Sequence, residues 1–271
     1  MIKAIFCDLD GTLLGSDMMI SAENSAAICE LEAAGVRFIP TSGRNFFEMP
    51  KEIREHKAIN HYLCSNGSGY YNLNTGESRH KSIPADKAAR VIDMFSRMSL
   101  VPIIHSVDGR GYFERTKLDY GLMRDHRMSE YYCKYFFENG YAVDNMYQHF
   151  TEGLGINSIC AFFKYDREIE EAKAELMQLG VGCTNSTFGE LEIFNPKAGK
   201  GNGLRDFAAA HGLSLDETMA IGDSMNDKSM LEATPNSVAV SNANEKILGI
   251  VKHVGCSNEE HIMRYVVDEI L

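Results

Sequence analysis

The stretch IFCDLDGTLL, residues 5–14, is an apolar run that ends at two aspartates on either side of one leucine, followed by Gly-Thr. Side chains at positions i and i+2 of a strand point the same way, so Asp8 and Asp10 can crowd one small space where the strand ends. Two carboxylates that close repel each other, which is tolerated mainly where a cation binds or a proton is shared. Taken alone, the pair is equally compatible with a turn that carries two solvated acids.

Three distant segments carry related signals: PTSGR at 40–44 after the apolar run 36–39, AGKG at 198–201, and MAIGDSMND at 219–227. Together with residues 5–14 they resemble the four motifs of the haloacid dehalogenase-like (HAD) phosphohydrolases, in the family's order and with wide gaps. The long insertion between the second and third motifs resembles the Cof-type subfamily of sugar-phosphate phosphatases. The resemblance covers nearly the whole chain, and four motifs in order are far more specific than any one of them.

Composition places the chain among globular proteins and limits its partners. Its 271 residues exceed the usual size of a single hydrophobic core and predict two domains. The net charge of −11, from 38 acidic and 27 basic residues, argues against nucleic acid as a partner. A small phosphorylated substrate needs only a local cationic pocket and is not excluded. Nothing in the composition indicates an oligomeric state.

Seven scattered cysteines without a C-x-x-C pair indicate reduced thiols in a cytoplasmic protein, not a disulfide framework or a zinc site. No run approaches the roughly 20 apolar residues of a membrane span. Too few apolar residues precede Asp8 for a signal peptide. We therefore expect a cytoplasmic protein with no membrane partner.

Short apolar runs alternate with segments of helical spacing at both ends of the chain. Ser21 is placed to cap a helix that Gly35 stops, and residues 45–56 look helical, with Pro50 leaving the start of that helix open. Further strands are expected at 36–39, 61–65, 219–221, 237–240 and 252–254, and further helices at 201–211, 226–233 and from about Asn258. This alternation predicts an α/β, Rossmann-like core whose parallel sheet is covered on both faces.

The middle of the chain has a different pattern. Strand pairs are expected around Asn74-Thr75-Gly76 and Asp108-Gly109, and the other expected elements are a helix at 85–98, an aromatic-rich helical stretch at 119–139, a strand at 156–164 and a helix at 167–179. These predict an α+β domain at 84–186, with linkers near 82–84 and 186–189, inserted into a catalytic core formed by 1–83 and 187–271. The family resemblance implies that the insertion is a cap that closes over the active site and sets substrate specificity.

The resemblance also assigns chemistry to the two aspartates of the first motif. Asp8 would be the nucleophile that forms an aspartyl-phosphate. Asp10 would protonate the leaving oxygen and then deprotonate the water that cleaves the intermediate. Phosphoryl-storing ATPases of the superfamily carry Thr at the second position, so a carboxylate there indicates that the intermediate is hydrolysed or passed on.

The resemblance further implies Mg²⁺, held by Asp8, the backbone carbonyl of Asp10 and Asp223, with Asp227 orienting the metal shell or Lys200. The residues expected to contact the substrate phosphate are Ser42, Gly43, Lys200, Asn66 and Asn226. Two alternatives remain at this point: Asn66 is also a suitable turn residue before Gly67, and Ser42 is also a suitable N-cap for the helix that follows.

The sequence departs from the family in two places. Ser42 stands where Thr is commoner, which keeps the hydroxyl, and NEEHI at 258–262 replaces a usual Gly-Val. We expect a Mg²⁺-dependent phosphatase of small phosphorylated metabolites, most directly sugar phosphates. The alternatives are a phosphomutase of the same superfamily and, from another class, a non-catalytic protein that binds a phosphate ligand. The specificity of a cap follows no motif, so the sequence names no single substrate.

Overall fold

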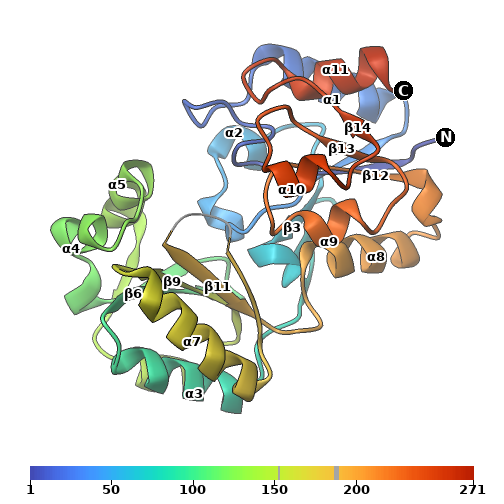
Figure 1. The fold of residues 1–271 in the computed structure, drawn as a ribbon. Coiled ribbons are helices and arrows are strands. Elements are labelled where there is room, and N and C mark those ends of the chain that lie inside the picture. Colours follow the sequence, from blue (N-terminus) through green and yellow to red (C-terminus); the bar gives the residue numbers. More distant parts are fainter. Residues whose placement is uncertain (152, 186–188) are drawn as a thin grey trace. The chain divides into compact units, whose positions relative to one another are not determined.

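The computed structural model describes residues 1–151, 153–185 and 189–271, and it divides into two compact units (Figure 1). The core unit comprises Met1–Arg79 and Gly199–Leu271, and the inserted unit comprises His80–Ala198. Each unit has its own sheets and its own buried apolar cluster or clusters, so each is described separately.

A five-stranded sheet with the order β14-β13-β12-β1-β2 forms the centre of the core unit, and every neighbouring pair in it is parallel. Its strands are β1 (Ala4–Cys7), β2 (Arg37–Pro40), β12 (Thr218–Gly222), β13 (Ser237–Ala239) and β14 (His253–Val254). All four residues of β1 are buried, as a central parallel strand requires of an uninterrupted apolar run. The prediction of a parallel α/β core is confirmed.

Helices on the core unit bury apolar side chains against this sheet. They are α1 (Ala22–Ala33), α8 (Lys200–Ala210), α9 (Lys228–Leu231), α10 (Glu245–Leu248) and α11 (Ile262–Glu269), with a 3₁₀ turn η4 at Leu215–Glu217. Ser21 caps α1 by accepting a hydrogen bond from the Asn24 amide, as the sequence predicts. Helices α1 and α11 lie side by side (Figure 1), and Phe207 of α8 packs edge-to-face on Phe6.

One expectation for the segment after β2 is wrong, and the strand expected at 61–65 has an additional antiparallel partner. Residues 45–56 do not form one helix but a 3₁₀ turn η1 (Phe46–Glu48) and a short α2 (Lys51–Arg54), because Pro50 is extended and cannot continue a helix. Strand β3 (His61–Cys64) pairs antiparallel with β4 (Gly69–Asn72) in a three-stranded sheet completed by β5 (Glu77–His80). A parallel bridge between Thr41 and Leu63 connects β3 to the end of β2.

A six-stranded mixed sheet with the order β10-β11-β9-β6-β7-β8 forms the inserted unit. Its strands are β6 (Leu100–Ser106), β7 (Gly111–Glu114), β8 (Tyr141–Val143), β9 (Ile156–Phe163), β10 (Gly182–Thr184) and β11 (Glu190–Phe194). Its helices are α3 (Ala85–Ser96), α4 (Tyr120–Asp125), α5 (Glu130–Asn139), α6 (Met146–Thr151) and α7 (Asp166–Leu179), and η3 (Arg115–Lys117) is a 3₁₀ turn.

Apolar side chains project from both faces of this sheet and pack against helices. Leu100 and Ile104 of β6 pack in one cluster with residues of α3, α6 and α7, whereas Val101 and Ile103 pack in another with residues of α4 and α5. This alternation is the period of two that a strand imposes, and it places α3 and α7 on the opposite face from α4 and α5 (Figure 1). The expected α+β character of the insertion is confirmed.

The insertion extends further than the sequence indicates. The boundaries expected at 84 and 186 differ from those of the compact unit, which runs from His80 to Ala198. The reason at the second boundary is β11, which pairs antiparallel with β9, Ile193 opposite Ile159, and therefore belongs to the inserted sheet. The linker expected near 186–189 lies mostly outside the described residues, and the role of the insertion as a cap remains a prediction.

All seven cysteines are free thiols. Within the described ranges, no helix is both long and apolar enough to cross a membrane.

Candidate active site

The ends of two neighbouring strands bring the first acidic residues together. Asp8 follows β1 and Asp223 follows β12, and these strands pair in parallel register with Cys7 opposite Ile221. The Asp8 amide donates a hydrogen bond to the Ile221 carbonyl at 2.9 Å. Because the carboxyl ends of parallel strands meet at one edge of a sheet, both carboxylates reach the same space. One oxygen from each of Asp8, Asp223 and Asp227 lies within 4.8 Å of the others.

Lys200, the first residue of α8, connects two of these acids. Its Nζ donates to Asp8 Oδ1 and to Asp227 Oδ1, each at 2.6 Å, and the exposed fractions of the Lys200, Asp8 and Asp227 side chains are 0%, 6% and 0%. Burial alone would lower the pKa of the Lys200 ammonium, but the adjacent charges of Asp227 and Asp8 outweigh it and raise that pKa. These two contacts therefore favour the charged form of Lys200 beside Asp8.

Asp227 also organises the loop that carries Asp223. Its second carboxylate oxygen accepts hydrogen bonds from the backbone amides of Asp223 and Ser224, both at 3.0 Å. The chain needs glycine at 222 for this approach, because a Cβ there would lie 2.6 Å from the Asp227 carboxyl carbon. Asp227 thus contacts both Lys200 and the loop that carries Asp223, and its expected role in orienting the metal shell or Lys200 remains a prediction.

Electrostatics at this edge favour an additional cation. Burial raises the pKa of Asp8 well above its usual range, the charge of Asp227 raises it further, and only Lys200 among its larger influences opposes them. Burial and Asp227 raise the pKa of Asp223 to about 6, although Asp223 Oδ1 accepts a hydrogen bond from the Thr12 hydroxyl at 3.0 Å. Ionising both acids together is costly without more positive charge nearby. Three clustered carboxylates are the hard oxygen donors that Mg²⁺ prefers, so the residues present fit this ion.

Asp10 has a different partner from the other acids. Arg44 Nε donates to Asp10 Oδ2 at 2.9 Å and Arg44 Nη2 donates to Asp10 Oδ1 at 2.6 Å, while Nη1 donates to the Glu48 carbonyl at 2.9 Å. The carboxylate of Asp10 is not one of the three clustered carboxylates, and a metal contact through the backbone carbonyl of Asp10 remains a prediction. Arg44 had no role in the sequence prediction. The available signal was a lone arginine immediately after Ser-Gly at the end of the strand beside β1.

Ser42 and Gly43 form the turn that follows β2. The Ser42 amide donates to the Leu63 carbonyl at 3.0 Å, and Ser42 Oγ accepts from the Arg44 amide at 3.1 Å. Ser42 is therefore not the N-cap of the next helical segment, since Asn45 caps η1. Gly43 is half-buried in the same turn.

Asn66 and Asn226 meet at the same edge of the core unit. Asn66 adopts a left-handed conformation with φ of 52°, and its carbonyl accepts from the Gly199 amide at 2.9 Å. Asn226 Nδ2 donates to Asn66 Oδ1 at 3.4 Å, and the Asn66 amide donates to the Ser42 carbonyl at 3.0 Å. Asn66 is therefore the turn residue before Gly67 that one of the two interpretations predicts. Its hydrogen bonds connect this turn to the segments that carry Ser42, Lys200 and Asn226.

The sequence profile of the haloacid dehalogenase-like hydrolases matches residues 5–265. The chain belongs to this family. It is 26% identical to phosphatase YwpJ of Bacillus subtilis over the whole of both chains. It is also 26% identical to the 5-amino-6-(5-phospho-D-ribitylamino)uracil phosphatase YwtE of the same organism, over 100% of this chain and 98% of the relative.

Solved structures agree with this assignment. A haloacid dehalogenase-like hydrolase from B. subtilis superposes with a TM-score of 0.85 at 25% identity, and the match covers 100% of both chains. The family and Cof-type assignment predicted from the four motifs is confirmed, and the protein is a phosphatase of the haloacid dehalogenase-like family.

Proposed function

We propose that this phosphatase is Mg²⁺-dependent and hydrolyses small phosphorylated metabolites, most directly phosphate esters of sugars and sugar alcohols, through an aspartyl-phosphate on Asp8. The observation that carries the proposal is the buried Lys200 ammonium, 2.6 Å from both Asp8 and Asp227. A carboxylate that attacks an anionic phosphoryl group must overcome charge repulsion, and a fixed cation against the nucleophile reduces it. A protein that only bound phosphate would not need a carboxylate in this place.

In the first step, an Asp8 carboxylate oxygen forms a bond to phosphorus while the ester P–O bond breaks. Asp10, in its protonated form, gives its proton to the departing oxygen, which leaves as an alcohol. In the second step, a water oxygen attacks the phosphorus of the aspartyl-phosphate and Asp10 accepts the water proton. The bond between phosphorus and Asp8 breaks, which releases inorganic phosphate and restores both aspartates.

Mg²⁺ would be held by the carboxylates of Asp8 and Asp223 and by the carbonyl of Asp10. When bound, it supplies positive charge that offsets the charge on the phosphoryl oxygens. The hydroxyl of Ser42, the amide of Gly43 and the side chains of Asn66 and Asn226 would donate hydrogen bonds to those oxygens. Asp227 is a positioning residue, because it contacts Lys200 and the loop of Asp223.

The substrate class rests on the chemistry named for a relative. YwtE is named for a uracil whose ribitylamino chain carries a phosphate. We propose that this chain likewise acts on a phosphate ester of a small polyhydroxylated carbon chain. A cytoplasmic location is part of the proposal, because seven free and scattered cysteines suit a reducing compartment.

A panel of phosphate monoesters assayed with Mg²⁺ tests the proposal. Sugar and polyol phosphates should release inorganic phosphate, excess chelator should abolish the release, and added Mg²⁺ should restore it. Ca²⁺ should inhibit, since its larger and looser coordination shell would misplace the attacking oxygen. The variant Asp223→Asn tests the metal site itself. Because it removes one charged ligand, it should raise the Mg²⁺ concentration needed for the half-maximal rate of hydrolysis.

Three outcomes would contradict the proposal. Full activity in excess chelator would show that hydrolysis does not require Mg²⁺. Tight binding of phosphate esters with no turnover across the panel would indicate a binding protein. Dependence on a bisphosphorylated sugar, with transfer in place of release, would indicate a phosphomutase.

A further inference from the structure

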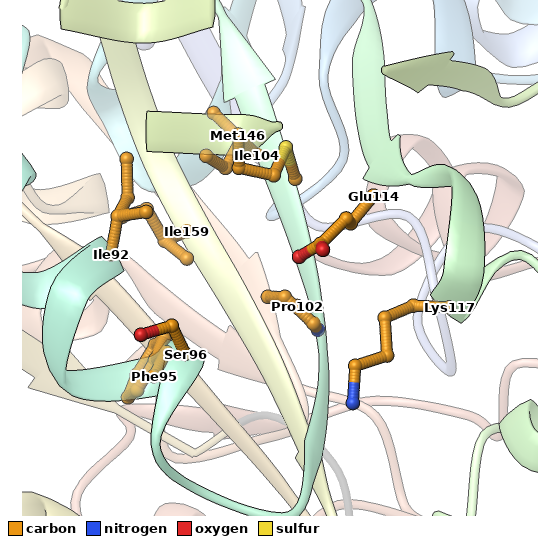
Figure 2. A pocket seen from close by; sticks show the side chains of 9 residues that line it. All are labelled: Ile92, Phe95, Ser96, Pro102, Ile104, Glu114, Lys117, Met146 and Ile159. Atoms are coloured by element: carbon orange, nitrogen blue, oxygen red, sulfur yellow. The ribbon is translucent and has the colours of Figure 1, made fainter. Parts of the chain in front are cut away.

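A cavity of about 110 Å³ opens in the inserted unit between α3 and the sheet (Figure 2). Its wall is largely apolar and comes from α3, β6, α6 and β9. The five buried side chains of this wall are Ile92, Phe95, Ile104, Met146 and Ile159. A buried apolar wall favours an alkyl group over water as the occupant.

The strand pairing explains why the space is open. The ladder between β6 and β7 pairs His105 with Gly111 and Ile104 with Tyr112. The same register continued would place Pro102 opposite Glu114, but proline has no backbone N–H to donate, so the ladder ends there. Pro102 and Glu114 both line the cavity.

Two opposite charges lie at this cavity. Glu114 and Lys117 are both half-buried and both line it, and in Figure 2 they lie on the side opposite Ile92 and Phe95. Among the described residues, neither side chain takes part in an ion pair or a hydrogen bond, with the other or with any third group. The intervening Arg115, by contrast, pairs with Asp144 at 2.7 Å.

The size of the cavity limits the occupant. A cavity of about 150 Å³ holds a benzene ring of six carbons. The cavity of this protein, at about 110 Å³, is smaller and takes an alkyl group of about four carbons and no aromatic ring. It is also smaller than the sites that hold drug-sized ligands. The occupant is therefore a small molecule with one alkyl group of about four carbons.

We propose that this cavity binds a branched aliphatic α-amino acid. The alkyl side chain of the ligand fills the apolar wall, its ammonium pairs with Glu114 and its carboxylate pairs with Lys117. A ligand with a single charge would leave one of the two protein charges without a partner, and a neutral ligand would leave both. The cavity is lined by residues of the inserted unit alone, whereas the phosphatase residues belong to the core unit, and the proposal does not depend on the proposed function.

Calorimetric titration of the whole protein with L-leucine tests the ligand class. Two analogues each lack one charged group: 4-methylpentanoate lacks the ammonium and 3-methylbutylamine lacks the carboxylate. Each should bind about tenfold more weakly than leucine, since a hydrogen bond to a charged group is lost. L-phenylalanine should bind at least as weakly as the analogues because its ring exceeds the cavity.

Two variants assign the charges. In Glu114→Gln, the preference for leucine over 4-methylpentanoate should disappear, and in Lys117→Met the preference for leucine over 3-methylbutylamine should disappear. Glu175→Gln, on the exposed surface of α7, is the matched control and should keep both preferences. Methyl NMR locates the ligand, because the resonances of Ile92, Ile104 and Ile159 should shift with leucine while those of Ile28 and Ile39 in the core unit should not.

The proposal is overturned if leucine at millimolar concentration shifts none of these methyl resonances. It is equally overturned if leucine and 4-methylpentanoate bind the unaltered protein with the same affinity, or if phenylalanine binds as well as leucine.

Discussion

Arg44 and Asp10 form a two-point ion pair, in which the guanidinium donates one hydrogen bond to each carboxylate oxygen, at 2.9 and 2.6 Å. The Arg44 side chain is 2% exposed and that of Asp10 is 35% exposed. A planar guanidinium fixes the plane of the carboxylate it holds, so the buried arginine determines where the more accessible aspartate points. If Asp10 is the general acid and base, Arg44 is its positioning residue.

Arg44→Lys keeps the positive charge but cannot make the two-point pair. We expect kcat to fall about 10- to 100-fold with a smaller change in KM, because the proton donor is misaligned while the phosphate contacts remain. Steady-state kinetics on a sugar phosphate measures this, in a variant shown to be folded by its thermal unfolding. With an aryl phosphate, whose departure needs little acid, the loss should move to the second step and phosphoenzyme should accumulate. An unchanged kcat would show that Arg44 does not position Asp10.

Lys200 neutralises two buried carboxylates, and its removal should destabilise the core unit. Lys200→Met leaves Asp8 and Asp227 close together without their shared cation, which should cost about 3–5 kcal/mol in the free energy of unfolding. The double variant Lys200→Met/Asp227→Asn should recover part of the lost free energy of unfolding, because it removes one of the two buried charges. Chemical denaturation measures both. Lys228→Met is the control, since its pair with Glu232 is exposed and should contribute less than about 0.5 kcal/mol. Equal losses in Lys200→Met and Lys228→Met would contradict this account of the buried pairs.

His61 should make stability depend on pH. Burial, followed by the nearby His211 and Arg37, lowers the pKa of His61 from 6.5 to about 4. The unfolded chain therefore binds more protons between these values, so the free energy of unfolding falls as the pH drops from 6.5 towards 4. Because His61 is only half-buried, solvent screening reduces its contribution to roughly 1 kcal/mol.

Urea unfolding of His61→Phe at several pH values tests this contribution. The variant should lose less stability on acidification than the unaltered protein, while the exposed His253→Gln should behave like the unaltered protein. Some pH dependence of stability should persist in both variants, because burial also lowers the pKa of His56 and His80. An identical loss in His61→Phe and the unaltered protein would refute the assignment.

The sequence predicts the parts of the site that follow from strand ends. Asp8 and Asp223 each terminate an apolar run, and parallel strands bring such ends to one edge. Lys200 lies 192 positions from Asp8, so no local pattern relates them, and the family resemblance alone brought the lysine into the prediction. The pair of Arg44 with Asp10 was missed because it depends on the tertiary placement of β2 beside β1.

Other differences between prediction and structure have local causes. The strand ELEIF at 190–194 was missed because Glu190 and Glu192 are charged yet buried, which is uncommon for glutamate. Residues 61–65 were correctly expected to form a strand, and a parallel bridge connects it to the end of β2, but its antiparallel pairing with β4 was not expected. A short apolar run looks the same in a parallel and in an antiparallel sheet, and the turn into β4 decides between them.

The division of labour between Asp8 and Asp10 is the central claim, and trapping of a labelled phosphoenzyme tests it most directly. Asp8→Asn and Asp10→Asn would each be mixed with an aryl phosphate labelled in the phosphoryl group, then quenched in acid and measured for label on the protein. The first step with this substrate needs little acid, whereas hydrolysis of the intermediate needs the Asp10 base. The account predicts label on Asp10→Asn, attached at residue 8, and none on Asp8→Asn. Label retained by Asp8→Asn would contradict it.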